Sequence, residues 1–387
     1  MSKKPSHQLR CDLKISHYLG VFNKMTLRLL NIIPSFAGGG AEHQLVKQSL
    51  ELASRGIDVH IAYLHGGPNL KSVQQSSIVL HQMRVLGSYD PSVILLLCNI
   101  FYKIKPTVVQ TWLLHSDIFG GIAAQLFGIP WVLSERSSGA MYEHGYKYLI
   151  RRHIGLQADA IIANSENGLN YWRNANFSGL GYVIRNIINI DITNKYQLAK
   201  KATDEPMVIG VGRFVEGKNW LNLLTALELV MEKDVRVRAM LIGDGPMRNV
   251  IESRIAASNV LKGRIDLPGY LYNIADHFRR ATVFISLSRY EGCPNVVLEA
   301  AAVGCPLILS DIPAHRELFL EEEVCFVSTD EKWSAADAIT DVLNNTSSYM
   351  QRAKHVRSRL EAFSTENLIR DYIAVYRRIS EKCRVVD

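Results

Sequence analysis

Short apolar runs rich in Val and Ile alternate with longer amphipathic stretches along almost the whole chain. The short runs have the length and composition of buried strands, and the longer stretches repeat their apolar positions with a helical period. This alternation predicts βα units and parallel sheets. The expected strands are Leu27–Ile33, Ile57–Leu64, Thr107–Gln110, Pro130–Leu133, Ala160–Ala163, Tyr182–Ile184, Met207–Val211, Arg238–Ile242, Val283–Ser286, Pro306–Leu309 and Val324–Val327. The expected helices include Ala41–Arg55, Asp117–Phe127, Asn219–Glu232, Asn295–Val303 and Thr365–Lys382.

The length of 387 residues suits two domains. The polar segment Asp191–Pro206 precedes a fresh apolar run, and we place the linker there. The predicted fold class is α/β, with two doubly wound Rossmann-like domains facing each other across a cleft. We expect residues 25–195 to form the N-terminal domain and residues 196–366 to form the C-terminal domain. Residues 1–24 contain no continuous apolar stretch, so we expect a disordered extension rather than a secretory signal.

Composition narrows the class of protein further. No run approaches the roughly 18 apolar residues of a membrane span. The six cysteines form no C-x-x-C pair and no zinc spacing, which favours free thiols in the cytoplasm. Residues 1–195 contain 19 Lys and Arg against 11 Asp and Glu, and the remainder is nearly neutral. This basic half is expected to meet an anion: nucleic acid, the inner face of an anionic membrane, or a phosphorylated lipid acceptor.

The segment Arg289–Leu309 contains two candidate carboxylates. Glu291 lies in a strand-to-helix turn, and Glu299 lies on the same helix face as Asn295. A buried carboxylate needs hydrogen-bond donors, and sugar hydroxyls would supply them. The helix start after Pro294 also offers free N–H groups for a phosphate. Taken alone, Glu291 as a helix cap and Glu299 as the partner of an internal Arg is the favoured alternative.

Two cations follow the first strand of the second half. Arg213 and Lys218 project from the loop of Val208–Asn219, beside a helix N-terminus. Such a pair can hold a diphosphate without a divalent ion, although isolated surface cations are more often simply solvated. No Asp-x-Asp pair occurs in the chain, so the usual carboxylate clamp for Mg²⁺ is missing, and we expect no cofactor and no metal.

Three further loops end predicted strands. Three glycines in Ser35–Glu42 let the backbone approach a ligand closely, although a plain turn is equally compatible with them. His115 opens a helix at the edge of the first domain, where its neutral imidazole could bind a sugar hydroxyl. Gly269 and Tyr270 lie in a loop that could receive a nucleotide base.

Together these features resemble the retaining glycosyltransferases of family 4, which have the two-domain GT-B fold. The likeness covers about residues 26–380. The E-x7-E element matches Glu291 and Glu299, and the interdomain stretch V-I-x-N-G-[IV]-D matches Val183–Asp191, with Ile187 where Gly is usual.

The resemblance implies that residues 25–195 form the acceptor-side domain and residues 196–366 the nucleotide-sugar-binding domain, and it implies roles for residues around the donor. Cys293 stands where the family often has Phe, which weakens any inference about the donor sugar. The C-terminal helix, residues 367–382, is expected to pack back on the first domain. The implied residues are Glu291 and His115 for catalysis; Arg213, Lys218, Gly39, Gly40, Val296 and Val297 for the diphosphate; and Glu299, Asn295 and Cys293 for the donor sugar and ribose.

The implied reaction is a metal-independent, front-face transfer from a UDP-linked sugar to a hydroxyl of a glycan or lipid-linked glycan, as in bacterial polysaccharide or lipopolysaccharide synthesis. The segment Tyr146–Ile154 is equally compatible with two interpretations. It is either a basic helix that binds the inner face of the cytoplasmic membrane or an ordinary solvated helix. Arg136 is a candidate contact for donor or acceptor. A nucleotide-sugar epimerase of similar architecture and a non-catalytic membrane or nucleic-acid module are the competing hypotheses, and we expect no nucleic-acid partner.

Overall fold

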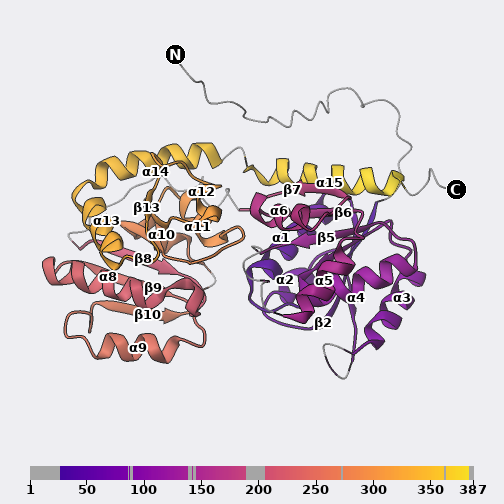
Figure 1. The fold of residues 1–387 in the computed structure, drawn as a ribbon, viewed down its shortest axis with the longest axis horizontal. Coiled ribbons are helices and arrows are strands. Elements are labelled where there is room, and N and C mark those ends of the chain that lie inside the picture. Colours follow the sequence, from indigo (N-terminus) through magenta and orange to yellow (C-terminus); the bar gives the residue numbers. More distant parts are fainter. Residues whose placement is uncertain are drawn as a thin grey trace, which may run out of the picture.

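The chain folds into two lobes that lie side by side in the computed structural model (Figure 1). The structure describes residues 27–382, apart from residues 86, 88–89, 138–141, 143–144, 189–204, 272 and 361–362. The expected N-terminal extension and most of the expected linker therefore lie outside the described residues. Each lobe is built on one parallel sheet with helices on both faces, which confirms the predicted fold class.

The first lobe contains a seven-stranded parallel sheet in the order β3-β2-β1-β4-β5-β6-β7. The order reverses beside β1, and in such sheets a ligand crevice opens at the carboxyl ends of the strands at this point. The strands are β1 (Arg28–Ser35), β2 (Asp58–His65), β3 (Val79–Gln82), β4 (Val108–Trp112), β5 (Trp131–Glu135), β6 (Ala160–Ala163) and β7 (Leu180–Val183).

Alternating side chains of β1 explain why both faces of this sheet are covered. Leu29 and Ile33 pack into one core cluster, and Leu30 and Ile32 pack into another on the opposite face. Both faces are apolar because every second residue of the strand is buried on each side. The helices are α1 (Gly40–Ser54), α2 (Leu70–Gln74), α3 (Ser92–Ile104), α4 (Leu113–Leu126), α5 (Tyr146–Gly155) and α6 (Glu166–Asn174).

The second lobe contains a six-stranded parallel sheet in the order β10-β9-β8-β11-β12-β13. Its order reverses between β8 and β11, which places the second crevice beside the loops that follow these two strands. The strands are β8 (Met207–Val211), β9 (Arg238–Ile242), β10 (Ile265–Gly269), β11 (Val283–Ser286), β12 (Leu307–Ser310) and β13 (Cys325–Val327). The helices are the 3₁₀ turn η2 (Glu216–Lys218), α8 (Trp220–Lys233), α9 (Arg248–Ala256), α10 (Ala275–Arg280), α11 (Asn295–Ala302), α12 (Pro313–Arg316), α13 (Lys332–Asn344) and α14 (Thr346–Leu360).

The C-terminal helix α15 (Thr365–Lys382) leaves the second lobe and lies along the first, as Figure 1 shows in yellow. Its apolar side chains, including Ile369 and Val375, belong to the core cluster of the first lobe. Tyr376 is fully buried there, and its hydroxyl contacts the side chains of Gln48 and Gln110. The helix therefore ties the end of the chain to the first sheet.

Two strands escaped sequence analysis, and both are edge strands. The side chains of β3 and β10 are exposed or half-buried, because each strand has a neighbour on one side only. A half-exposed strand does not need a continuous apolar run, so the pattern that revealed the central strands is absent there.

Helix α5 does not present all of its basic side chains to solvent. Arg151 points into the lobe, where its guanidinium pairs with Asp117 at 2.7 Å and with Glu135 at 2.9 Å. Both carboxylates are fully buried, and burial raises the pKa of Asp117 to about 6 while Arg151 counteracts that rise. Trp172 donates a hydrogen bond to Glu135 at 2.9 Å. The predicted solvated or membrane-facing cation at position 151 is thus a buried structural one.

We predict that Arg151→Met destabilises the fold by about 3–5 kcal/mol, because it leaves two buried carboxylates without their cation. The matched control is Arg152→Met on the same helix, where the native side chain is exposed and the expected change is within about 0.5 kcal/mol. Urea denaturation followed by circular dichroism measures both. Equal stability of the two variants would contradict the buried role.

Candidate active site

A cleft of about 1010 Å³ lies between the lobes and is lined by residues of both. The loops that line it follow β1, β8, β9, β10 and β11, so both sheets direct the carboxyl ends of their strands toward it. Among the predicted site residues the cleft is lined by Gly39, Gly40, Arg213, Lys218, Tyr270, Glu291, Cys293, Asn295, Val296, Val297 and Glu299.

Two cations of the second lobe reach the cleft from the loop after β8. Trp220 donates its indole N–H to the carbonyl of Arg213 at 3.0 Å, which fixes the loop against α8. Lys218 ends the turn η2 and contacts the carboxylate of Glu291 from the β11–α11 loop. The sequence separation between Lys218 and Glu291 is 73 residues, and the order of the sheet brings them together because β8 and β11 are neighbours.

Two helix N-termini face each other across the cleft. Helix α1 begins after Gly39 and helix α11 begins after Pro294, and neither first turn has a side-chain cap. The first backbone N–H groups of α11 are therefore available to an anion, whereas in α1 the carboxylate of Glu42 accepts a bond from its own backbone N–H. A Cβ on Gly40 would lie 3.1 Å from the amide nitrogen of Asn295, so the two helix starts approach closely.

Asn295 is the centre of the junction between the lobes. Its side-chain oxygen accepts hydrogen bonds from Asn186 at 2.6 Å and from Gln44 at 3.3 Å. Gln44 also accepts a hydrogen bond from the backbone N–H of Ile187 at 2.7 Å. The sequence predicts Asn295 as a contact of the donor sugar, and the structure places it at the junction between the lobes. Gln44 and Asn186 were missed, and no local pattern marks them.

Glu299 pairs with Lys47, which the sequence analysis missed. The ammonium of Lys47 on α1 lies 3.6 Å from the carboxylate of Glu299 on α11, so the ion pair joins the two lobes. Burial raises the pKa of Glu299, and Lys47 counteracts that rise. The alternative from the sequence was an internal Arg as the partner of Glu299, whereas the observed partner is a Lys of the other lobe.

A further carboxylate, Glu42, lines the cleft near the glycine loop. It is buried in the first turn of α1, and burial raises its pKa while Arg213 across the cleft acts in the opposite direction. A Cβ on Gly39 would lie 2.4 Å from an oxygen of this flexible carboxylate, so a larger residue there would displace the Glu42 side chain. Glu42 follows the glycine run closely in the sequence, and this proximity could have predicted that its side chain lies at the cleft.

His115 is not among the side chains that line the cleft. It lies in the first turn of α4, packed against Phe119 with ring centroids 4.8 Å apart, and only 8% of it is exposed. Leu113 starts this helix with a left-handed backbone (φ 71°), which turns the chain sharply after β4. Burial lowers the pKa of His115 to about 4, with His65 adding to the effect, so the imidazole is neutral at pH 7.

Two further predicted site positions, Cys293 and the end of β10, differ in how far they are exposed to solvent. Cys293 is buried, and burial raises its pKa to about 11, so the thiol is not ionised at pH 7. Tyr270 is half exposed at the cleft, and its hydroxyl lies 3.2 Å from the imidazole of His43 in the first lobe. Gly269 ends β10 with a left-handed backbone (φ 81°) and is not among the cleft-lining residues.

Arg136 is a cleft residue of the first lobe that lacks a carboxylate partner among the described side chains. Its guanidinium stacks 4.4 Å from the ring of Trp112 and donates a hydrogen bond to the hydroxyl of Tyr372 on α15 at 2.7 Å. The described part of the chain contains no group of three or more His, Cys, Asp or Glu side chains that could hold a metal ion.

Comparison with known proteins gives two successive family matches. The model described as Glycosyltransferase Family 4 matches residues 38–192, and that described as Glycosyl transferases group 1 matches residues 191–359. The capsular polysaccharide biosynthesis glycosyltransferase CapM of Staphylococcus aureus is 23% identical over 348 residues, which are 84% of this chain and 91% of that protein.

A second relative acts on a lipid-linked substrate according to its name. The N-acetylgalactosamine-N,N'-diacetylbacillosaminyl-diphospho-undecaprenol 4-alpha-N-acetylgalactosaminyltransferase of Campylobacter jejuni is 24% identical over 219 residues, which are 56% of this chain and 59% of that protein. The chain spans only 32% and 56% of two further curated relatives that it matches. Among solved structures, Anabaena Alr3699/HepE in complex with UDP and glucose has a TM-score of 0.78 at 16% identity and covers 90% of this chain and 99% of that chain. This likeness shows the fold.

We predict that the cleft binds UDP and that Lys47→Met weakens this binding by about two- to fivefold at pH 6, because Glu299 loses the cation that opposes its raised pKa and takes up a proton at higher pH. The loss should shrink as the pH rises to 8, where the carboxylate is ionised in both proteins. Calorimetric titration between pH 5.5 and 8 measures it. Lys47→Arg keeps the charge and serves as the control; the same loss in both variants would exclude an electrostatic role.

Proposed function

This chain belongs to glycosyltransferase family 4, and we propose that it transfers a sugar from a nucleoside-diphosphate sugar, UDP-linked, to a hydroxyl of a glycan or lipid-linked glycan. One observation carries the proposal. Arg213, Lys218 and Glu291 come from two separate loops of the second lobe and meet at one cleft that the glycine loop of the first lobe also lines.

The cleft supports a leaving-group mechanism without a metal. The guanidinium of Arg213, the ammonium of Lys218 and the first N–H groups of α11 together offer charge and hydrogen bonds to a departing diphosphate. Lys218 contacts Glu291, so this carboxylate fixes the position of the ammonium at the cleft. Catalysis then consists mainly of positioning and electrostatic stabilisation.

We assign a retaining, front-face course to the reaction. The acceptor hydroxyl attacks the anomeric carbon on the face from which the diphosphate leaves, and a diphosphate oxygen takes the hydroxyl proton. Glu291 lies beside Lys218 and is therefore near the leaving group, where it would bind donor hydroxyls. His115 stays a candidate catalytic residue, but its side chain does not line the cleft and lies behind the residues that do. NMR of the product should show the anomeric configuration of the donor.

The acceptor belongs on the side of the first lobe. Arg136 contributes a cation to this wall of the cleft without a carboxylate partner in the described structure, which suits a phosphate of a lipid-linked glycan. The relatives named for capsular polysaccharide and for an undecaprenol-linked glycan support this class of acceptor.

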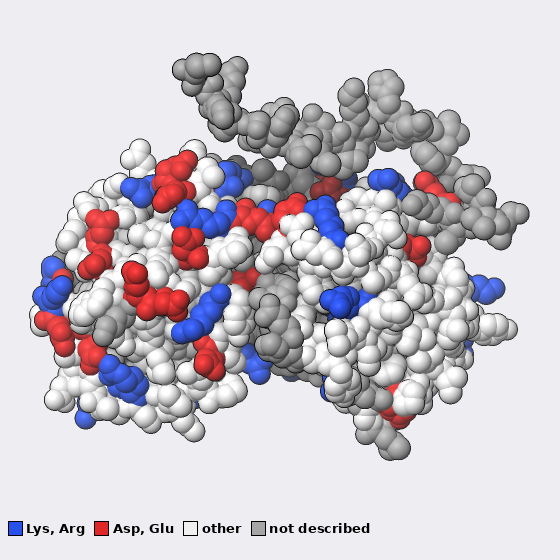
Figure 2. Space-filling model, in the orientation of Figure 1, with Lys and Arg blue, Asp and Glu red and all other residues white. Residues whose placement is uncertain are grey.

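The first lobe also has a face suited to an anionic membrane. Helix α4 packs between α3 and α5. Large apolar side chains of these three helices are exposed to solvent. Neither α3 nor α5 contains an acidic residue, and Figure 2 shows few charged side chains on the lobe's visible face. None of the described helices is both long and apolar enough to cross a bilayer. The exposed apolar residues are Leu95, Tyr102, Leu126, Phe127, Tyr146, Leu149 and Ile150.

Basic side chains accompany this apolar face. Lys103 and Lys105 follow the exposed Tyr102 at the end of α3, and Arg152 is exposed on α5. Apolar side chains that enter the headgroup region and cations that contact anionic lipids are the two elements of peripheral binding. We therefore propose that α3 and α5 lie on the membrane that holds the lipid-linked acceptor.

We predict that Arg213→Ala, Lys218→Ala and Glu291→Ala each lower kcat/KM for sugar transfer by about 100-fold or more, because each removes charge or contacts at the reacting groups. Arg236→Ala, an exposed cation of the same lobe, should leave the rate unchanged. Mass spectrometry of the glycosylated acceptor measures the reaction.

The same assay is repeated in EDTA, where the proposed metal-free mechanism requires an unchanged rate. Near-normal rates in all three variants would overturn the assignment of the site. Formation of an epimerised nucleotide sugar without acceptor would favour the epimerase alternative instead.

We predict that vesicles containing phosphatidylglycerol carry the protein upward in flotation, whereas pure phosphatidylcholine vesicles do not, because the cations need anionic lipid. Leu95→Glu combined with Leu149→Glu should abolish flotation, since both side chains belong to the apolar face. The control is Val235→Glu, at an exposed apolar position of the second lobe. Equal flotation of both variants would contradict this face as the contact.

A further inference from the structure

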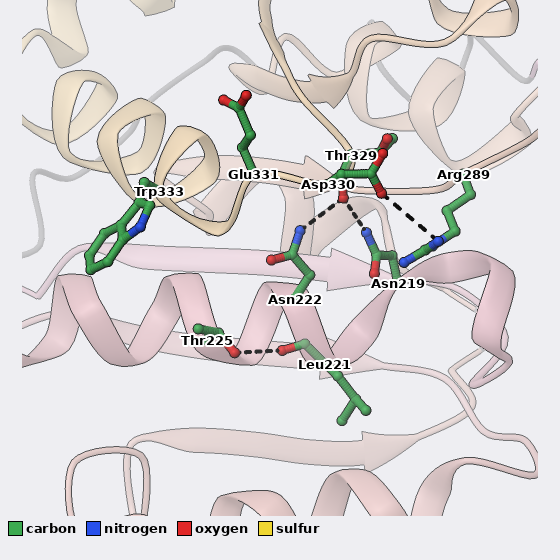
Figure 3. A pocket seen from close by; sticks show the side chains of 9 residues that line it. All are labelled: Asn219, Leu221, Asn222, Thr225, Arg289, Thr329, Asp330, Glu331 and Trp333. Atoms are coloured by element: carbon green, nitrogen blue, oxygen red, sulfur yellow. Dashed lines mark hydrogen bonds and ion pairs between the residues drawn. The ribbon is translucent and has the colours of Figure 1, made fainter.

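A second hollow, separate from the cleft, lies on the second lobe between α8 and the start of α13 (Figure 3). Its volume is about 590 Å³, within the range of ligand-binding pockets. We call it the α8–α13 groove and define it by its lining residues. These are Asn219, Leu221, Asn222, Thr225, Arg289, Thr329, Asp330, Glu331 and Trp333.

The groove presents mainly hydrogen-bond acceptors. Asn219 and Asn222 both donate their side-chain N–H to the carbonyl of Thr329, at 2.9 and 3.1 Å, as Figure 3 shows. Their side-chain oxygens accept no hydrogen bond within the described structure. The hydroxyl of Thr225 donates to the carbonyl of Leu221 and so also keeps its lone pairs for a ligand. A matching ligand must donate many hydrogen bonds.

Trp333 provides an exposed aromatic surface at one end of this groove. Its exposed fraction is 56%, whereas Trp112, Trp131, Trp172 and Trp220 are all buried. A large flat apolar ring next to polar acceptors suits a ligand with one apolar face and a polar edge. A pyranose ring has this shape, because its C–H groups gather on one face and its hydroxyls project from the rim.

The charges of the groove select against anions. Arg289 lies 3.9 Å from Asp330, and Glu331 adds a second carboxylate, so the lining has one cation and two carboxylates. A phosphate or uronate would meet net negative charge there. We propose that the α8–α13 groove binds an uncharged oligosaccharide chain, as a glycan site distinct from the donor cleft.

The position of the groove links it to the reaction that it would serve. Asn219 directly follows Lys218, and Arg289 lies two residues before Glu291. The backbone N–H of Arg289 donates to the carbonyl of Gly217 at 2.9 Å, so the two loops are joined between groove and cleft. A glycan bound in the groove is held against the outer side of the loops that hold the donor.

Tryptophan fluorescence tests the proposal on the full chain, because Trp333 is the one exposed tryptophan and all five lie in the described part. The probes are two uncharged hexasaccharides, cellohexaose and chitohexaose, and an oligogalacturonate of similar length as the anionic control. We expect a saturable change in emission with at least one uncharged probe and none with the oligogalacturonate. Calorimetry gives the affinity independently of the fluorophore.

Two substitutions of the ring separate stacking from folding. Trp333→Ala should weaken binding about tenfold or more, and Trp333→Phe, which keeps a ring, should bind within about threefold of the native protein. Glu331→Gln keeps the acceptor oxygen but removes a negative charge, so it should allow detectable binding of the oligogalacturonate, which the native protein should not bind. The circular dichroism spectrum and the urea midpoint should be unchanged in all three variants, which shows that they fold.

Absence of binding by both uncharged probes, or equal affinity of Trp333→Ala and the native protein, would overturn the groove as a glycan site. Because these readouts need no sugar transfer, they are independent of the proposed reaction. Glycan binding without transfer activity would contradict only the proposed sugar transfer. Transfer activity without glycan binding would contradict only the proposed glycan site in the α8–α13 groove.

Discussion

The hydrogen bonds that converge on Asn295 hold the two lobes at the separation on which the whole site depends. Asn295 is the first residue of α11 in the second lobe. Its hydrogen-bond partner Gln44 belongs to the first lobe, and its partner Asn186 belongs to the segment that leaves the first lobe. Without this junction the glycine loop and the cations of the second lobe would line two separate surfaces. The ion pair between Lys47 and Glu299 lies on the same two helices and adds a charge-dependent contact.

The charge balance of the cleft follows from this arrangement. Lys218 and Lys47 each contact a carboxylate, whereas Arg213 and Arg136 have no carboxylate ion pair among the described side chains. Unpaired cations in a concave site are costly to the free protein through mutual repulsion and favourable to an anionic ligand. A diphosphate donor facing one lobe and a phosphorylated acceptor facing the other would account for both arginines.

In the first lobe, helix α5 has a buried arginine directly followed by an exposed one. Arg151 of α5 neutralises Asp117 and Glu135 in the interior, while its neighbour Arg152 remains at the surface. The interior pairing fixes how α5 is rotated, and that rotation exposes Leu149 and Ile150. The apolar face of the lobe therefore depends on a buried charge cluster beneath it, and α15 anchors the opposite face of the same sheet.

The sequence by itself determined the fold class and the loops that form the cleft, because buried parallel strands need continuous apolar runs and their carboxyl ends share one edge of a sheet. Strands β3 and β10 lacked this signal as edge strands. Only the tertiary structure decided that Lys47 reaches Glu299 and that His115 lies behind the cleft wall. Contacts between lobes depend on how two complete sheets are oriented, and no local spacing of residues encodes that orientation.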